Sequence, residues 1–391
     1  MVISESRSLK EILTEGEWIK DLEKLSLMCK DVIEIPDGMS LDCPNLTTLI
    51  CERPNFLGAE TEMFPNFISD SFFSRLDGLC FLNLSGSAIA KLPNSLSNLE
   101  KLKSLDLSFC RNLVDIPNLG KLKKLREFDL FGTAITKLPQ GLFLNFPLLQ
   151  VLRLPCTMKV PVEEIVSLKC LEEFVGLVGN VSDLSKFFTY RKSQFLDILH
   201  ILVPGRDYEI SKGYERFWHL ESFHLCRVNQ VEVRGYDLKN EDLRVLVQDI
   251  PSLTLMECKG LNGFTRLSEP SSLKALAISA CQEIECLLDN EAFLTANLEH
   301  ESRFPLLRNL EQISLRGLPN FVAFFQNVGA TIQPPPPQAI VFSSLRFLCI
   351  CRCNKIRKLG LPSSAFPNLE TINIIWCSQL EEIIEVQEGE G

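Results

Sequence analysis

Apolar residues recur along the chain with one spacing, which is clearest between Leu102 and Leu125. In this stretch leucines stand at positions 1, 4 and 6 (Leu102, Leu105 and Leu107), a cysteine at position 9 and a leucine at position 12. The same order begins again at Leu125, 23 residues further on. Because side chains alternate along a strand, positions 4 and 6 point to one face and positions 3, 5 and 7 to the other. The pattern therefore predicts a short strand in each repeat, with its leucines buried.

A period of roughly 20–29 residues with this leucine spacing is typical of leucine-rich repeats. One such unit cannot bury its leucines alone, so successive units must stack. We expect about 14 strands, counted from the recurring apolar residue at position 1. These openings are Leu22, Leu46, Leu79, Leu102, Leu125, Leu149, Leu171, Leu196, Leu220, Ile250, Leu273, Leu310, Leu345 and Leu369. The predicted fold is α/β: a leucine-rich repeat solenoid, a curved horseshoe with a parallel β-sheet on the concave face and irregular loops and short helices on the convex face.

The repeats are expected to fill residues 22–391, with residues 1–21 as an N-terminal flank that lacks the pattern. The spacing is loosest from Leu171 to Leu220. Wider intervals indicate insertions near 52–75, 287–305 and 326–342. Ser69 and Asp70 precede an apolar run in the first insertion, as at a helix start. The third contains four consecutive prolines, which favour a polyproline loop.

Composition narrows the class of protein. Of 391 residues, 46% are hydrophobic and 23% charged, which is ordinary for a globular chain. The formal net charge of −10 argues against a general nucleic-acid binder. Fifteen cysteines, an odd number in a long chain, fit a reducing compartment better than a disulfide framework. No signal peptide or membrane span is visible, so we expect a soluble, cytoplasmic protein.

Five cysteines occupy position 9 of their repeats. Metal binding or redox chemistry is one interpretation, and a buried position that closes the turn after each strand is the favoured one. One cysteine per repeat places the sulfurs in a column instead of the tetrahedron that zinc requires. They are Cys110, Cys258, Cys281, Cys353 and Cys377. No nucleophile, metal or phosphate-loop motif stands out, so we expect no catalytic residue, no metal site and no enzymatic activity.

Large apolar residues at positions 7 and 8 are candidate protein-binding residues, because aromatic side chains on an open concave face often form binding hot spots. Burial of these side chains under neighbouring loops is the alternative. The candidates are Met28, Phe109, Phe131, Ile375 and Trp376.

Basic residues gather in one part of this acidic chain. Residues 91–159 hold eleven Lys and Arg against five Asp and Glu, a balance of +6, which leaves −16 for the remainder. Lys101 and Lys124 share the place before position 1, and Lys103 and Arg126 share position 2. These four residues are expected to line one edge of the solenoid, either as a solvated face or as a docking edge for an acidic partner.

The N-terminal repeats resemble one family in particular. VIEIP, CPNLTTLIC and LNLSGSAIAKLPNSLSNLEKLKSLDLSFCRNLVDIPNLGKLKKLREFDLFGTAITKLPQG are similar to the leucine-rich domain of plant intracellular NLR immune receptors of the coiled-coil type. FPNLETINIIWCSQLEEII resembles that family's last repeats, and SLKEILTEGEWIKDLEKLSL resembles the junction after its winged-helix module. The extracellular plant repeat LxGxIP is absent.

The resemblance implies a domain that senses pathogen effectors, directly or through a guarded host protein, and that holds the receptor's nucleotide-binding module inactive. The family's phosphate loop and N-terminal coiled coil are missing from this sequence, so its ADP or ATP site cannot be assigned to any residue here. We expect protein partners and no cofactor in this chain. Two alternatives are an extracellular leucine-rich receptor or inhibitor, suggested by sequons at Asn45, Asn83 and Asn180, and a substrate adaptor of a ubiquitin ligase.

Overall fold

The computed structural model falls into two compact units. Unit 1 comprises Met1–Val178 and Tyr190–Leu199, and unit 2 comprises Gly179–Thr189 and His200–Gly391. The residues that the structure describes are 2–3, 21–28, 34–35, 43–52, 67–191, 196, 198–205, 230–238, 246, 250–264, 272–288, 309–325, 342–359 and 366–383.

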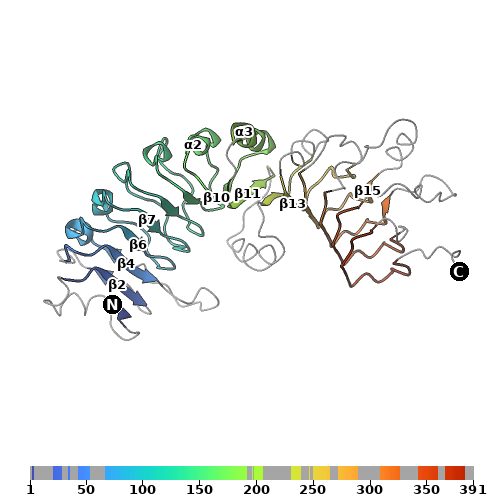
Figure 1. The fold of residues 1–391 in the computed structure, drawn as a ribbon, viewed down its shortest axis with the longest axis horizontal. Helices are drawn as coiled ribbons and strands as arrows, with labels where there is room; N and C mark the ends of the chain where they lie inside the picture. The colour runs from blue at the N-terminus through green and yellow to red at the C-terminus, as the bar shows by residue number, and fades with distance from the viewer. Residues whose placement is uncertain are drawn as a thin grey trace. The chain divides into compact units, whose positions relative to one another are not determined.

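Unit 1 is built on a ladder of parallel strands (Figure 1). From β2 to β10 each strand begins two residues after the opening residue of its repeat, as the leucine spacing predicts. Leu105 pairs with Phe128 in the next strand, so residues at the same repeat position lie side by side. The strands, in sheet order, are β1 (Val2–Ile3), β2 (Lys24–Met28), β4 (Thr48–Glu52), β6 (Phe81–Asn83), β7 (Ser104–Asp106), β8 (Glu127–Asp129), β9 (Val151–Arg153) and β10 (Glu173–Leu177).

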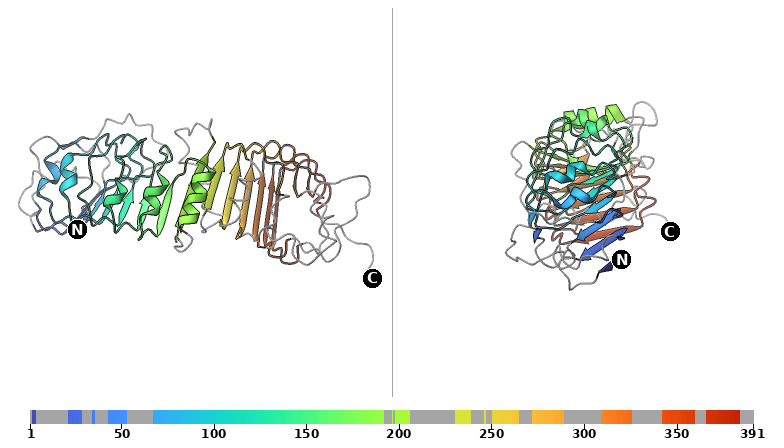
Figure 2. Two further views of the ribbon diagram at one scale, coloured as in Figure 1. Left: turned by 90° about the horizontal axis from the view of Figure 1, so that it is seen from above. Right: turned by 90° about the vertical axis from the view of Figure 1, so that its left-hand side faces the viewer.

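Unit 2 repeats the arrangement with longer strands, which Figure 2 shows lying side by side in yellow and orange. Thr254 pairs with Ala277 and Ala277 with Ser314, so this ladder is also in register. Its strands are β11 (Ile198–Pro204), which enters unit 2 at His200, β12 (Gln230–Arg234), β13 (Ser252–Met256), β14 (Ala275–Ser279), β16 (Gln312–Arg316), β18 (Phe347–Cys351) and β19 (Thr371–Ile375).

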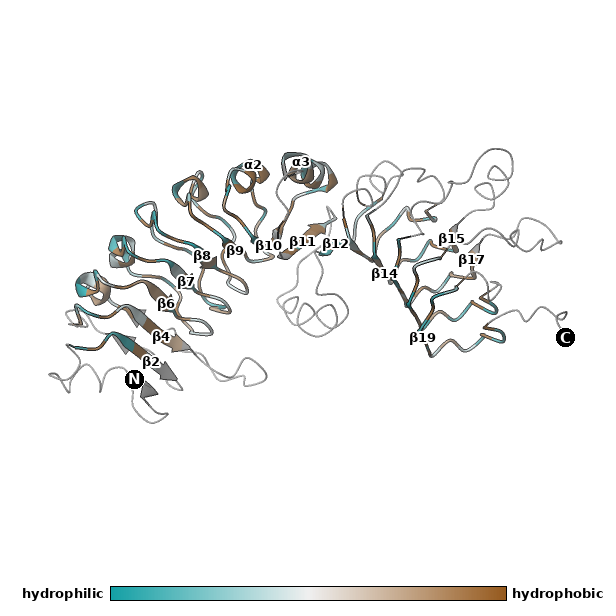
Figure 3. Cartoon of the chain, viewed as in Figure 1, coloured by the Kyte–Doolittle hydropathy of each residue, from teal (hydrophilic) through white to brown (hydrophobic). Residues whose placement is uncertain are grey.

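The core lies behind the sheets. Leu102, Leu105 and Leu107, which define the repeat, are fully buried. Burying one such side chain contributes about 1.5–3 kcal/mol, and stacked repeats add these contributions from one coil to the next. Figure 3 shows the resulting brown, apolar segments recurring along successive coils. The residues at positions 3, 5 and 7 point to the other side, which we call the concave face.

Short helices and small strand pairs lie on the side opposite the concave face (Figure 1). Proline precedes two of the helices, η2 and α2, where its missing N–H does no harm. The helices are η1 (Phe72–Arg75), η2 (Asn94–Asn98), η3 (Phe143–Asn145), α2 (Val162–Val166) and α3 (Val181–Arg191). The pairs are β3 (Glu34–Ile35) with β5 (Phe67–Ile68), and β15 (Cys286–Leu288) with β17 (Ala323–Phe325).

The structure departs from the sequence-based prediction in three places. The strand after β11 begins at Gln230, so the repeat expected to open at Leu220 is not the next strand of the sheet, and Leu220 itself lies outside the described residues. His200 pairs with Gln230, which shifts β11 by two residues from the predicted register. β1 adds a strand inside the predicted flank.

The inserted segments are described only in part. The first contains η1, a short 3₁₀ helix that begins two residues after Asp70, close to the predicted helix start. Residues 53–66, 289–308 and 326–341, which include the four prolines, lie outside the described residues.

Candidate protein-recognition surfaces

Position 8, directly after the concave strand, has a left-handed backbone in repeat after repeat. Its N–H donates to the position 7 carbonyl of the following repeat, as from Phe109 to Phe131 at 2.6 Å. Glycine suits this conformation because it has no Cβ. It stands there at Gly86, Gly132, Gly235 and Gly317. Five other repeats place a side chain on this backbone, at Phe109, Glu257, Ala280, Arg352 and Trp376, with φ between 53° and 59°.

Phe109 and Phe131 form one small aromatic cluster at the end of the concave strands. Their rings meet edge to face with centroids 5.5 Å apart. The Phe109 ring also lies over Gly132, where an added Cβ would come within 2.9 Å of it. Because Phe109 covers it, Phe131 is only 8% exposed, which corrects the expectation that it stands open on the face. Phe109 itself is half-buried.

Ile375 and Trp376, at the end of β19, are the most open of the predicted binding residues. They are 45% and 68% exposed. The guanidinium carbon of Arg352, at position 8 of the preceding repeat, lies 4.5 Å from the centre of the Trp376 ring. Such a cation–π contact at an exposed site contributes about 0.5–1 kcal/mol. Met28 ends β2, and the burial of its side chain is outside what the structure describes.

The four basic residues predicted to share an edge do lie on neighbouring rungs of unit 1. The N–H of Arg126 donates to the carbonyl of Lys103 at 2.7 Å, which places these two residues next to each other in the ladder. All four side chains are exposed. We call this set the basic edge: Lys101, Lys103, Lys124 and Arg126.

Charged residues also line the concave face of unit 1, which the leucine pattern alone did not reveal. Arg153 in β9 donates hydrogen bonds to Asp129 in β8, at 2.9 Å, and to Glu173 in β10. The other oxygen of Asp129 accepts the N–H of Phe131 at 2.8 Å. Burial, together with the nearby charge of Asp106, raises the pKa of the Asp129 carboxyl from 3.8 to about 6, although Arg153 opposes the shift.

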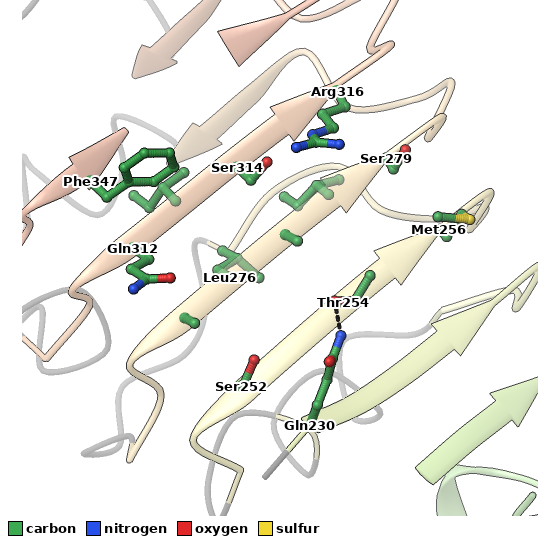
Figure 4. A pocket seen from close by; sticks show the side chains of 14 residues that line it. Gln230, Ser252, Thr254, Met256, Leu276, Ser279, Gln312, Ser314, Arg316 and Phe347 are labelled. Atoms are coloured by element: carbon green, nitrogen blue, oxygen red, sulfur yellow. Dashed lines mark hydrogen bonds between the residues drawn. The ribbon is translucent and has the colours of Figure 1, made fainter. Parts of the chain in front are cut away.

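Unit 2 has a hollow of about 80 Å³ on its concave face, shown in Figure 4. The side chains above its middle strand, β14, are Ala275, Ala277 and Ser279. Gln230 lines one side of the hollow and Arg316 lies on the other. The sequence pattern missed this feature because β12 was misplaced, although the small residues at positions 3, 5 and 7 of successive repeats were a readable signal.

Gln230 leaves one polar atom of its amide without a partner. The residue is 7% exposed, and its Nε2 donates to Thr254 Oγ1 at 2.9 Å. Its Oε1 is buried and has no hydrogen-bond partner. If the amide were turned around, Nε2 would be left over in its place. An unpaired buried polar group costs about 1–3 kcal/mol, and such a group in a native protein calls for an explanation.

Four of the five position 9 cysteines are buried, as their spacing suggested, and Cys377 is half-buried. Cys110 Sγ donates to the carbonyl of Leu84 in the preceding repeat at 3.1 Å, and Cys258 Sγ to that of Val233 at 3.4 Å. Each thiol thus links one coil to the one before. Among the described residues, no group of three or more His, Cys, Asp and Glu side chains could hold a metal ion.

The chain is similar in sequence to plant disease resistance proteins. Probable disease resistance protein At5g47260 of Arabidopsis thaliana is 26% identical over 99% of this chain, which matches 38% of that protein. Disease resistance protein At4g27190 is 26% identical over 95% of this chain, which matches 39% of that protein. Disease resistance protein RPS5 is 23% identical over 91% of this chain, which matches 38% of that protein. Both are also from Arabidopsis thaliana. The chain therefore spans about two fifths of the length of these relatives. No family model matches.

Two solved leucine-rich repeat structures have distant likeness to the chain. A leucine-rich repeat protein of Leptospira interrogans has a TM-score of 0.45 and 16% identity, covering 93% of this chain and 95% of that one. An internalin of Listeria monocytogenes has a TM-score of 0.43 and 15% identity, covering 97% and 94%. The repeat register and the parallel ladders define the leucine-rich repeat fold.

The described coils define a leucine-rich repeat protein, a class that works through protein–protein contacts. Along nearly its whole length, the chain is similar in sequence to plant disease resistance proteins. In the described residues, no helix is both long and apolar enough to cross a bilayer.

Proposed function

We propose that the chain is the non-enzymatic recognition domain of a cytoplasmic plant immune receptor, of the NLR class with an N-terminal coiled coil. The observation that carries the proposal is the similarity to plant disease resistance proteins over 91–99% of the chain. Exposed Ile375 and Trp376 at the end of β19 support a role in binding, since exposed aromatic and aliphatic side chains are frequent contact residues. The ligand is a pathogen effector or a guarded host protein.

The second part of the proposal is autoinhibition. The chain holds a nucleotide-binding module of the same receptor in its inactive state, and the basic edge pairs with acidic residues on that module. In this proposal the ADP or ATP site belongs to that module and not to this chain. One charge pair at a rim contributes only about 0.2–1 kcal/mol. Four together shift the balance between closed and open receptor by about 1–3 kcal/mol, a factor of about 5–150.

The test reverses the basic edge. A variant with Lys101, Lys103, Lys124 and Arg126 all changed to Glu is placed in the receptor, and activity is measured without a pathogen. In parallel, the chain is co-precipitated with the separate nucleotide-binding module over a series of salt concentrations. We expect the variant to bind the module more weakly and to activate the receptor. Salt should weaken the wild-type contact in the same way, because ions screen exposed charges.

A matched control reverses four other exposed basic residues of the same repeats. It changes the net charge by the same amount but leaves the four residues of the basic edge in place. The control residues are Lys91, Arg111, Lys121 and Lys137. We expect this control to bind the module like the wild type. If the wild type and both variants bind the module equally well, and salt does not change the binding, the basic edge is a solvated face and the proposed contact is wrong.

A further inference from the structure

The hollow on the concave face of unit 2 has the width of one polypeptide segment. Its floor is β14, where Ala275, Ala277 and Ser279 raise no large side chain. The flanking strands β13 and β16 each pair directly with β14. Strands in a sheet are about 4.8 Å apart, so the side chains of β13 and β16 rise roughly 10 Å apart across this floor, and Met256, Gln312 and Arg316 are the largest of them. An extended chain fits lengthwise between them.

The unpaired amide of Gln230 indicates what kind of group completes the hollow. Its side chain lines the hollow and leans from β12 onto Thr254 of β13 (Figure 4). The amide and the hydroxyl share one hydrogen bond, so one amide atom of this buried residue stays unsatisfied. A peptide group offers both an N–H donor and a carbonyl acceptor. The unpaired atom is buried in the free chain, so Gln230 must turn toward the hollow on binding, and a peptide group then satisfies the atom whichever way the amide is turned.

The charge of the lining indicates which side chains the segment carries. Of the fourteen described residues that line the hollow, Arg316 is the one charged residue, and it carries a positive charge in a chain of net charge −10. Phe347, on β18, adds an apolar surface on the same side. A carboxylate near Arg316 and an aliphatic side chain against Phe347 match this lining.

We propose that the hollow binds an extended segment of a partner protein, with a main-chain peptide group at Gln230 and an acidic side chain near Arg316. The inference rests on the proposed recognition function and gives it a site and a ligand chemistry. The hollow belongs to unit 2, whereas the basic edge belongs to unit 1.

Peptide selection tests the proposal. A library of random linear peptides displayed on phage is selected on the full 391-residue chain and depleted on an Ala277→Trp variant, whose indole fills the floor. Thr371→Trp is the matched control, because Thr371 is exposed at position 3 of β19 and outside the hollow. We expect enriched peptides to contain acidic and aliphatic residues. Fluorescence polarisation should show at least about tenfold weaker binding to Ala277→Trp and unchanged binding to Thr371→Trp.

Two further variants examine the individual contacts. Arg316→Glu should replace the acidic preference of the selected peptides by a basic one. Gln230→Met keeps the shape of the side chain without its amide, so peptide affinity should fall several-fold while the melting temperature of the free chain stays level or rises. Lower thermal stability with unchanged peptide affinity would assign Gln230 a structural role only and overturn its part in the site.

Two results overturn the proposal as a whole: no peptide enriched on the wild type over Ala277→Trp, or selected peptides that bind both equally. The receptor assay with the basic edge separates this failure from that of the proposed function. If receptor control by the basic edge holds and peptide selection fails, the hollow is not a site and the immune function stands. If peptides are selected but the receptor assay fails, the hollow is a peptide site without that function.

Discussion

The buried carboxyl of Asp129 makes a quantitative prediction about stability and pH. Its pKa rises from 3.8 to about 6 on folding, mainly because the side chain loses water and secondly because Asp106 repels its charge. The folded chain therefore keeps a proton on Asp129 that the unfolded chain releases near pH 4. Between about pH 4 and 6 the folded state binds more protons, so stability falls as pH rises through this window. A shift of about two units corresponds to an upper limit of about 3 kcal/mol.

Asp129→Asn removes this dependence, because the amide does not titrate. Its Oδ1 still accepts the N–H of Phe131, while the hydrogen bond from Arg153 is lost. Losing this hydrogen bond also changes the free energy of unfolding, by an amount that stays constant at low pH. The informative quantity is therefore how the stability difference between variant and wild type changes with pH. We expect this difference to move in favour of the Asp129→Asn variant by up to about 3 kcal/mol between pH 4 and 7.

Denaturant unfolding of both proteins across this pH range measures the difference, and hydrogen exchange of the β8 amides localises it to unit 1. Asp106→Asn is the matched control, because Asp106 holds the same repeat position and caps the N–H of Ser108 at 2.9 Å, but is only half-buried. Removing the charge of Asp106 should lower the pKa of Asp129 and so narrow the pH range over which stability falls. A stability difference that does not change with pH, or that changes in the opposite direction, refutes the reasoning.

The remaining predictions concern the core, the thiols and the ligands. Leu107→Asp puts a charge at a fully buried position and removes the stabilisation of about 1.5–3 kcal/mol that burial of the leucine contributes. Circular dichroism should therefore show loss of the fold. An unchanged melting temperature contradicts the repeat register. Burial raises the pKa of Cys110 and Cys353 to about 11, so iodoacetamide at neutral pH should label exposed Cys170 far faster, and equal rates contradict this. The chain should bind neither ATP nor ADP in calorimetry; micromolar affinity for either contradicts that expectation.

The leucine spacing was sufficient to predict most strands because position in a leucine-rich repeat is local information. A strand follows each opening residue by two positions from β2 to β10 and again from β13 to β19. The prediction failed around β11 and β12, where valine and isoleucine replace leucine. Two segments were candidates for the same place in the sheet: LESFHL, which starts at Leu220, and QVEVR, which starts at Gln230. One repeat pattern with two candidate starts cannot decide between them, because the choice depends on pairing with distant strands.

The candidate site was predictable to a lesser degree. The repeat register predicted that Lys103 and Arg126 are neighbours and that the basic side chains are exposed, and both features are present in the structure. It did not show that Phe131 is covered, because the cover is the ring of Phe109 from the preceding repeat. Nor did it show the raised pKa of Asp129, which depends on burial and on charges from two other strands. Contacts between repeats are a property of the stacked coils and not of one repeat sequence.

The backbone at position 8 separates residues that maintain the fold from residues that are available for binding. A side chain on this left-handed backbone costs roughly 1–2 kcal/mol relative to glycine, which other repeats use there. At Phe109 the ring recovers this cost by packing over Gly132 and against Phe131. At Trp376 the ring is 68% exposed, and its cation–π contact with Arg352 is worth about 0.5–1 kcal/mol. Folding alone thus favours glycine over tryptophan at residue 376, and strain of this kind typically accompanies function. Of the two aromatic residues at position 8, Trp376 is therefore the better candidate for a contact residue and Phe109 the better candidate for a structural one.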